Sequence, residues 1–127
     1  MTTSILIMAH APLASALREC VSHVFADRMH TVAALDVQAS DDAQTVLQQA
    51  RELRQTLGAS PVLVLADVLG ATPCNVAAQL TRDSSDALVS GVNLPMLWRA
   101  VAYQHEPVEQ VAQRALQGGQ QGVMMPS

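Results

Sequence analysis

A histidine and an aspartate, each placed directly after a short apolar segment, could do chemistry together. His10 follows the apolar run Ser4–Ala9, and Asp67 follows the run Pro61–Ala66. A carboxylate that accepts a hydrogen bond from one ring nitrogen of a histidine fixes the tautomer and leaves the other nitrogen free as a nucleophile. The pair therefore predicts a nucleophilic imidazole with an orienting carboxylate. Taken singly, His10 also fits an ordinary polar strand end, and Asp67 a cap of the next helix.

A loop of small residues, "LGATPCN", follows Asp67 closely. Its small side chains would let backbone N–H groups approach a ligand, and Thr72 stands where an N-cap is expected before Pro73. A threonine hydroxyl beside a cluster of N–H groups makes a phosphate cradle. An ordinary capped helix start is the alternative. The predicted phosphate-binding positions are Thr72, Ala71, Gly70 and Ala11.

A second glycine-containing loop, "SGVNLPML", precedes another helical segment. Asn93 could cap that helix or hold the loop in shape. Leu94, Pro95 and Met96 follow it, and their apolar side chains fit either a partner-binding surface or the core. These four residues are the predicted partner and loop positions.

The composition excludes several classes of function. The seven basic residues are all arginine, so neither a Walker A loop nor a Schiff-base site can be built. The net charge of −4 and the lack of a basic cluster argue against nucleic-acid binding. No apolar run reaches the roughly 20 residues of a membrane span, so we expect a cytoplasmic protein without membrane insertion.

The remaining histidines and the two cysteines predict no metal site and no cofactor. His23, His30 and His105 have no ligand spacing with one another or with the cysteines. Cys20 and Cys74 belong to no CxxC pair, and we expect both to be small buried thiols.

Short apolar segments alternate with segments of helical period along the whole chain, without a linker or repeat. This alternation predicts a single α/β domain over residues 1–127, with an open, mainly parallel sheet and helices on both faces. The segments that fit strands are Ser4–Ala9, Thr31–Val37, Pro61–Ala66 and Asp86–Gly91. Pro61–Ala66 is the most hydrophobic of them, so we expect it in the interior of the sheet. The segments that fit helices open at Pro12, Ser40, Pro73, Pro95 and Pro107.

Two helix boundaries are suggested by particular residues. Ser40 fits an N-cap with Asp41 and Asp42 in the first turn, where carboxylates favour the positive end of the helix dipole. The last helix is expected to close at Gly118 and Gly119. The final eight residues, "QQGVMMPS", fit either a short edge strand or a disordered end.

In an open parallel sheet, ligands bind beyond the carboxyl ends of the strands. His10, Asp67 and the loop after Gly91 occupy such ends on three strands, so we expect them to meet in space. The residues alone thus lead to phosphoryl transfer onto His10, without identifying the donor or the acceptor.

Three segments together resemble a known family. "ILIMAHAPLASALRECV", "VLVLADVLGATPCNVAAQL" and "LVSGVNLPMLWRAV" resemble, in order and spacing, the signatures of the mannose-type enzyme IIA domains of the bacterial phosphotransferase system. The resemblance implies four parallel strands with a further antiparallel strand near the C-terminus. It also implies that His10 accepts a phosphoryl group from the phosphocarrier HPr, that Asp67 hydrogen-bonds the imidazole, and that Thr72 and nearby amides contact the phosphoryl group.

The resemblance further implies onward transfer to a IIB domain, no Mg²⁺, and a homodimer in which the C-terminal strand is exchanged. The chain departs from the family pattern at Ala11, where a glycine is usual, and at its short C-terminal segment. No IIB domain follows, so an acceptor would be a separate protein.

Three alternatives compete with this interpretation. A response-regulator receiver needs an acidic pair after the first strand and a later lysine, and this chain has neither. The phosphotransfer subunit that feeds dihydroxyacetone kinase shares the fold and the histidine, but its loop differs from "DVLGATPCN". A non-catalytic module switched by histidine phosphorylation is compatible with the same residues.

Overall fold

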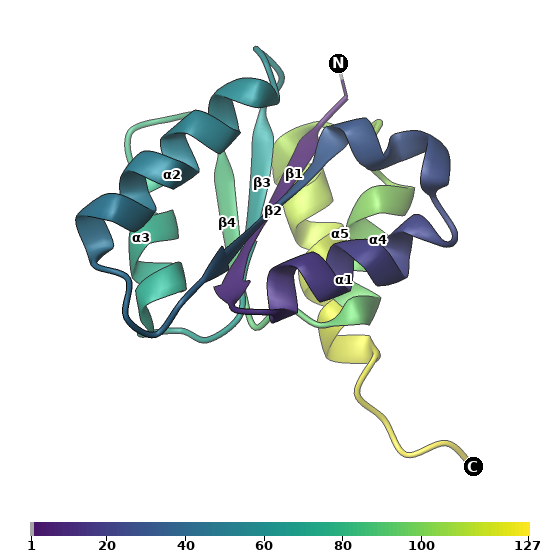
Figure 1. Ribbon diagram of the computed structural model, residues 1–127. Coiled ribbons are helices and arrows are strands. Elements are labelled where there is room, and N and C mark those ends of the chain that lie inside the picture. The colour runs from purple at the N-terminus through teal and green to yellow at the C-terminus, as the bar shows by residue number, and fades with distance from the viewer. Residues whose placement is uncertain (1) are drawn as a thin grey trace.

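The computed structural model describes residues 2–127, whose centre is a four-stranded sheet with all strands parallel. The strand order is β2-β1-β3-β4, so β1 and β3 lie in the interior (Figure 1). This confirms the predicted fold class and the interior position of the most apolar segment. The strands are β1 (Ser4–His10), β2 (Val32–Val37), β3 (Val62–Ala66) and β4 (Ala87–Ser90).

Helices cover both faces of the sheet (Figure 1). One face carries α1 (Leu13–Ser22), α4 (Leu94–Ala102) and α5 (Val108–Gln121), and the other carries α2 (Ala43–Thr56) and α3 (Thr72–Thr81). A short 3₁₀ helix, η1 (Ala26–Thr31), leads into β2 and was missed from the sequence.

The two faces of β1 build two separate apolar cores. Ile5 and Ile7 face the core under α1, α4 and α5, whereas Leu6 and Met8 face the core under α2 and α3. All four side chains are fully buried. Burial on both faces explains why the interior strands have continuous apolar sequences instead of alternating ones.

The second helix begins later than the sequence predicted. Its N-cap is Asp42, whose side chain accepts a hydrogen bond from the Thr45 N–H at 2.8 Å, so Ser40 is not the cap. Asp41 lies before the helix and accepts from the Gln38 N–H within the connecting turn. A carboxylate three residues before an N–H can satisfy it directly, which accounts for the choice of Asp42.

The last helix does not stop at Gly118 and Gly119 but continues to Gln121. A Cβ atom at Gly118 would lie 2.7 Å from Cβ of Arg99, and one at Gly119 would lie 2.7 Å from Cε of Met96. These glycines therefore permit α5 to approach α4 closely, and their presence has nothing to do with ending the helix.

Two further expectations were wrong. Cys20 is exposed, because α1 buries Ala14, Leu17 and Val21 on its inner face; Cys74 is buried as expected. The further antiparallel strand that the resemblance implied near the C-terminus is not found within residues 2–127: residues 123–127 form no strand, and the tail leads away from the body of the molecule (Figure 1). Within residues 2–127, no helix has the length and apolar character needed to cross a membrane.

A matched pair of leucine substitutions tests the burial of the sheet. Leu65 is fully buried in β3, whereas Leu69 is 80% exposed. Leu65→Ala should lower the free energy of unfolding by about 2–5 kcal/mol, because it removes apolar contacts and leaves a cavity. Leu69→Ala should change it by less than about 0.5 kcal/mol. Urea unfolding measures both values, and equal losses would contradict the assigned burial.

Candidate functional site

The ends of three neighbouring strands meet at one edge of the sheet. His10 is the last residue of β1, and Asp67 directly follows β3, which pairs with β1. The Gly91 N–H, after β4, donates to the backbone carbonyl of Asp67 at 2.9 Å. The expected meeting of His10, Asp67 and the loop after Gly91 is therefore confirmed.

The side chains of His10 and Asp67 are in direct contact. Nδ1 of His10 lies 2.7 Å from Oδ2 of Asp67, and the same oxygen accepts the backbone N–H of His10 at 2.9 Å. Oδ1 of Asp67 accepts the Val68 N–H at 2.9 Å. Because an ionised carboxylate can only accept, the ring proton lies on Nδ1 and the lone pair on Nε2.

Burial differs sharply between the two partners. The Asp67 side chain is 8% exposed, whereas that of His10 is 49% exposed. Burial acts to raise the pKa of Asp67. Hydrogen bonds from the His10 N–H, the His10 ring and the Val68 N–H lower it, as does the charge of the ring. The net effect is a pKa below the usual value for aspartate. Asp67 therefore stays ionised while the half-exposed imidazole faces solvent.

The phosphate cradle predicted from the sequence is only partly available. The N–H of Ala11 donates to the carbonyl of Val37 at 2.9 Å, and the N–H of Ala71 donates to that of Val68 at 3.2 Å. These two amides are therefore engaged within the protein. Gly70 and Thr72 remain as the candidate positions, and Gly70 has a φ of +91°, which a glycine adopts without strain.

Thr72 is not the N-cap of α3, contrary to the prediction. The extended residue before the helix is Ala71, and Thr72 is already the first helical residue, followed by Pro73. No side chain caps α3. Its N-terminus therefore keeps unpaired backbone donors beside a threonine, which is the arrangement that attracts an anion.

Sequence reasoning missed the pair Ser15 and Asp36, which closes the N-terminus of α1. Asp36 accepts the Ser15 N–H at 3.0 Å and its hydroxyl at 2.6 Å. Asp36 lies on β2 in register with Ala9, the residue before His10. Only the pairing of β2 with β1 brings this carboxylate to α1, so the sequence carried no signal for it. The N-terminus of α1 already has an anionic partner, which leaves α3 as the open one.

The predicted partner and loop residues divide between two roles. Asn93 is the N-cap of α4, accepting from the Met96 N–H at 2.9 Å, and its Nδ2 donates to the Gly119 carbonyl at 3.2 Å. Met96 is buried in the core, and the half-buried Leu94 packs against the same core. Pro95 is exposed, so among the three apolar residues it has the most surface available to a partner.

Apolar side chains are exposed in the loop that carries Asp67. Val68 is 54% exposed and Leu69 is 80% exposed, and Leu13 at the start of α1 is 38% exposed. No group of three or more His, Cys, Asp or Glu residues in the described part of the chain could hold a metal ion.

The fold and the site together define a parallel α/β protein with an exposed, carboxylate-bound histidine at the ends of its strands. The family model described as "PTS system fructose IIA component" matches residues 4–116. The chain therefore belongs to the mannose-type IIA family of the phosphotransferase system, as the resemblance implied.

Solved structures agree with this assignment. The mannose/sorbose-specific IIA subunit from Enterococcus faecalis is 26% identical, with a TM-score of 0.88 over 100% of this chain and 96% of that one. The phosphotransferase component EIIA from Streptococcus agalactiae is 24% identical, with a TM-score of 0.85 over 97% and 96%. The PTS IIA protein associated with the fucose utilization operon of Streptococcus pneumoniae is 21% identical, with a TM-score of 0.81 over 98% and 96%. A comparison with curated proteins found no match.

The lowered pKa of Asp67 predicts a specific dependence of stability on pH. An unfolded aspartate titrates near pH 4, above the folded value, so the unfolded state binds more protons as the pH falls below about 4. The stability that Asp67 contributes is thus complete above about pH 4 and is lost as the pH falls through its folded pKa.

Urea unfolding between about pH 7 and pH 3 should therefore show a smaller acid loss of stability in Asp67→Asn than in the wild type. Some loss of stability with falling pH should remain in Asp67→Asn, because two other carboxyl groups also have lowered pKa values. The Thr45 N–H lowers the pKa of Asp42, and Arg114 lowers that of Glu106. Asp27→Asn on η1 is the control and should keep the wild-type profile. An unchanged profile in Asp67→Asn would show that this carboxylate is not stabilised by its hydrogen bonds.

Proposed function

We propose that this protein is the phosphocarrier of its system: His10 accepts a phosphoryl group from phospho-HPr and passes it to a IIB-type acceptor. The observation that supports this role is the 2.7 Å contact between Nδ1 of His10 and Oδ2 of Asp67. It leaves Nε2 of a half-exposed ring as the nucleophile. Membership in the IIA family favours phosphoryl transfer over other uses of such an imidazole.

In the proposed step, the Nε2 lone pair of His10 attacks phosphorus while the P–N bond to the donor histidine breaks. The electron pair of that bond returns to the donor imidazole. The proton on Nδ1 of His10 stays in its hydrogen bond to Asp67, which offsets the positive charge that develops on the ring. Transfer to the acceptor is the same step in reverse, with the acceptor's nucleophile replacing the donor ring.

The phosphoryl group on Nε2 would be held by backbone donors and the hydroxyl of Thr72 at the start of α3. The open N-terminus of α3 and the glycine conformation at Gly70 support this placement. The carboxylate of Asp36 at the N-terminus of α1 disfavours a second anion there. No metal ion or cofactor takes part in the proposed transfer.

The surface around His10 suits a protein partner. Val68 and Leu69, in the loop directly after Asp67, expose apolar side chains, and exposed apolar groups near a reactive residue are characteristic of docking surfaces. We propose that the HPr donor and the IIB acceptor use this surface in turn, in the cytoplasm, and that the chain acts as a homodimer.

Intact mass measures acceptance directly. Purified protein incubated with phosphoenolpyruvate, enzyme I and HPr should gain about 80 Da, the mass of one phosphoryl group, and His10→Ala should gain nothing. His23→Ala, at an exposed histidine far from the site, is the matched control and should be phosphorylated normally. A phosphorylated His10→Ala protein would place the acceptor elsewhere.

Asp67→Asn should slow phosphorylation by roughly 10²-fold, because an amide can donate to Nδ1 and so favour the wrong tautomer. Rapid-quench measurement of the phosphorylated fraction gives the rate, with Asp27→Asn as the charge-matched control. The loss should lie in the rate at saturating phospho-HPr and not in its half-saturating concentration. Equal rates in Asp67→Asn and the wild type would reduce Asp67 to a structural role.

A further inference from the structure

The outer edge of β2 is open along part of its length. β2 is the first strand in the sheet order β2-β1-β3-β4, so it pairs only with β1. In Figure 1 it runs across the front of the sheet, between α2 and α1, and no helix of the described chain crosses its outer edge. An edge strand presents unpaired N–H and C=O groups that another strand can bind. Neither the family assignment nor the proposed function gives this edge a role.

The hydrogen bonds of β2 show which of its backbone groups face outward. The Ala11 N–H donates to the Val37 carbonyl at 2.9 Å, so the backbone groups of Val37 face β1. Successive residues of a strand direct these groups to opposite sides, and every second residue before Val37 therefore also faces β1. The backbone groups of Val32, Ala34 and Asp36 face away from the sheet.

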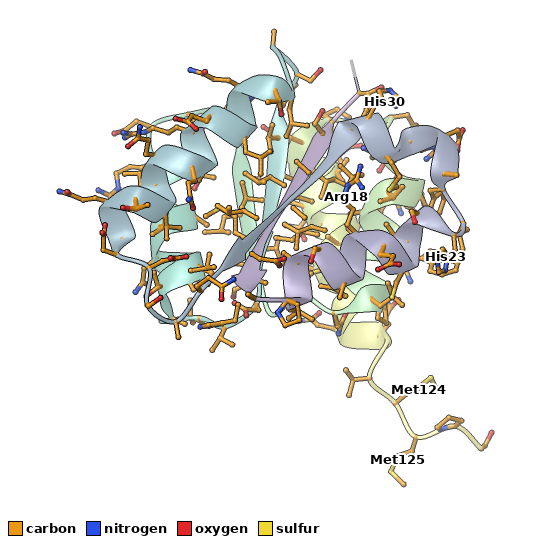
Figure 2. All side chains as sticks on the ribbon, in the orientation of Figure 1. Arg18, His23, His30, Met124 and Met125 are labelled. Carbon is orange, nitrogen blue, oxygen red and sulfur yellow. The ribbon has the colours of Figure 1, made fainter. Side chains whose placement is uncertain are left out.

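The protein covers the beginning of this edge but not the rest. The Val32 carbonyl accepts Nε of Arg18 at 2.7 Å, and Figure 2 shows Arg18 beside this part of β2. The Val32 N–H donates to the Met29 carbonyl. Within residues 2–127, no hydrogen bond occupies the outward N–H and C=O groups of Ala34 and Asp36. Each of these two residues therefore offers one donor and one acceptor to an added strand.

Two cavities adjoin this open edge and meet at Ala34 and Leu53, which line both of them. The first cavity, of about 540 Å³, lies toward the beginning of β2. Its apolar walls include Leu53 and Leu57 of α2 and Met29 of η1. The small side chain of Ala34 leaves this space open, so an apolar side chain of an added strand could fill it.

The second cavity, of about 570 Å³, lies toward the end of β2 and is acidic. Its charged lining residues are all carboxylates: Asp36, Asp41 and Glu52. Both oxygens of Asp36 bind Ser15, at 2.6 and 3.0 Å. Glu52 is exposed, and its one side-chain contact is a long hydrogen bond of 3.5 Å from Gln48. Glu52 is therefore available to a basic side chain.

The basic residues near the open edge lie at its other end. Arg18 and His30 line the first cavity. The guanidinium of Arg18 is held by the carbonyls of Val32 and Met29, at 2.7 and 2.8 Å. The charge along the edge thus changes from basic at the beginning of β2 to acidic at its end, which favours a segment with its own basic group at the acidic end.

We propose that the open edge of β2 binds an extended segment of another protein, in which an apolar residue and a lysine or arginine stand two positions apart. The backbone of this segment pairs with Ala34 and Asp36, its apolar side chain fills the first cavity, and its basic side chain meets Glu52. Residues two apart in a strand lie on one face, roughly 7 Å from each other, which suits two adjoining cavities. A second copy of this chain fits less well, because pairing of two β2 edges would bring two acidic cavities together.

Amide hydrogen exchange of the free protein tests whether the edge is open. The N–H groups of Ala34 and Asp36 should exchange at least about tenfold faster than that of Leu35, which faces β1. Slow exchange of Ala34 and Asp36 at every protein concentration would mean that the edge is already covered. Protection that increases with protein concentration would mean that a second copy occupies it. Either result would overturn the proposal.

Synthetic peptides test the occupant by NMR on the isotope-labelled intact protein. The peptides TVTRT and TRTVT place valine and arginine two positions apart in either strand direction. At up to about 2 mM, one of them should shift the Ala34 and Asp36 amide signals in a saturable manner and slow the exchange of both amides. The acidic counterparts TVTET and TETVT should bind at least about threefold more weakly. A fully N-methylated form of the bound peptide, which has no backbone donors, should not bind.

Variants test the charge and separate this site from His10. Glu52→Arg should weaken binding of the basic peptide at least about threefold. Glu109→Arg, at an exposed glutamate on α5, should not. His10→Ala should bind the peptide as the wild type does, so a failure of the proposed phosphoryl transfer would leave this result unchanged. Equal binding of basic and acidic peptides, or no shift at Ala34 and Asp36 up to about 2 mM, would overturn the proposal.

Discussion

The whole site depends on one buried carboxylate. Oδ2 of Asp67 accepts both the backbone N–H and the ring of His10, while Oδ1 accepts the Val68 N–H. The backbone carbonyl of the same residue accepts the Gly91 N–H from the next strand. Asp67 is thus hydrogen-bonded to the ends of β1 and β4 as well as to its own loop after β3. These hydrogen bonds fix the carboxylate, and the carboxylate in turn orients the imidazole of His10.

The N-termini of α1 and α3 have different partners. A carboxylate on β2, Asp36, occupies the N-terminus of α1 through Ser15, whereas α3 has no side-chain cap. Both helices direct the positive ends of their dipoles toward the same edge of the sheet. The start of α3 at Thr72 therefore keeps unpaired backbone donors, whereas the start of α1 faces a carboxylate.

Close packing connects this edge to the C-terminal helix. Asn93 caps α4 and also donates to the Gly119 carbonyl on α5, where glycine allows α5 to approach Met96 and Arg99. A side chain at Gly118 would collide with Cβ of Arg99 and force the two helices to shift, whereas one at Gly119 would meet the flexible end of the Met96 side chain. The loop after β4 is therefore held from two sides, by Asp67 and by α5.

The sequence by itself determined the alternation of strands and helices, the interior place of β3 and the pairing of His10 with Asp67. Each of these follows from local apolar period and from the rule that parallel strands end at one edge. The tertiary structure alone decided that Ala11 and Ala71 use their amides internally, that Asp36 closes α1, that Gly118 and Gly119 lie inside a helix, and that Cys20 faces solvent. These features depend on contacts between strands and helices that are far apart in the chain. Local sequence patterns do not encode such contacts, so only the tertiary structure shows them.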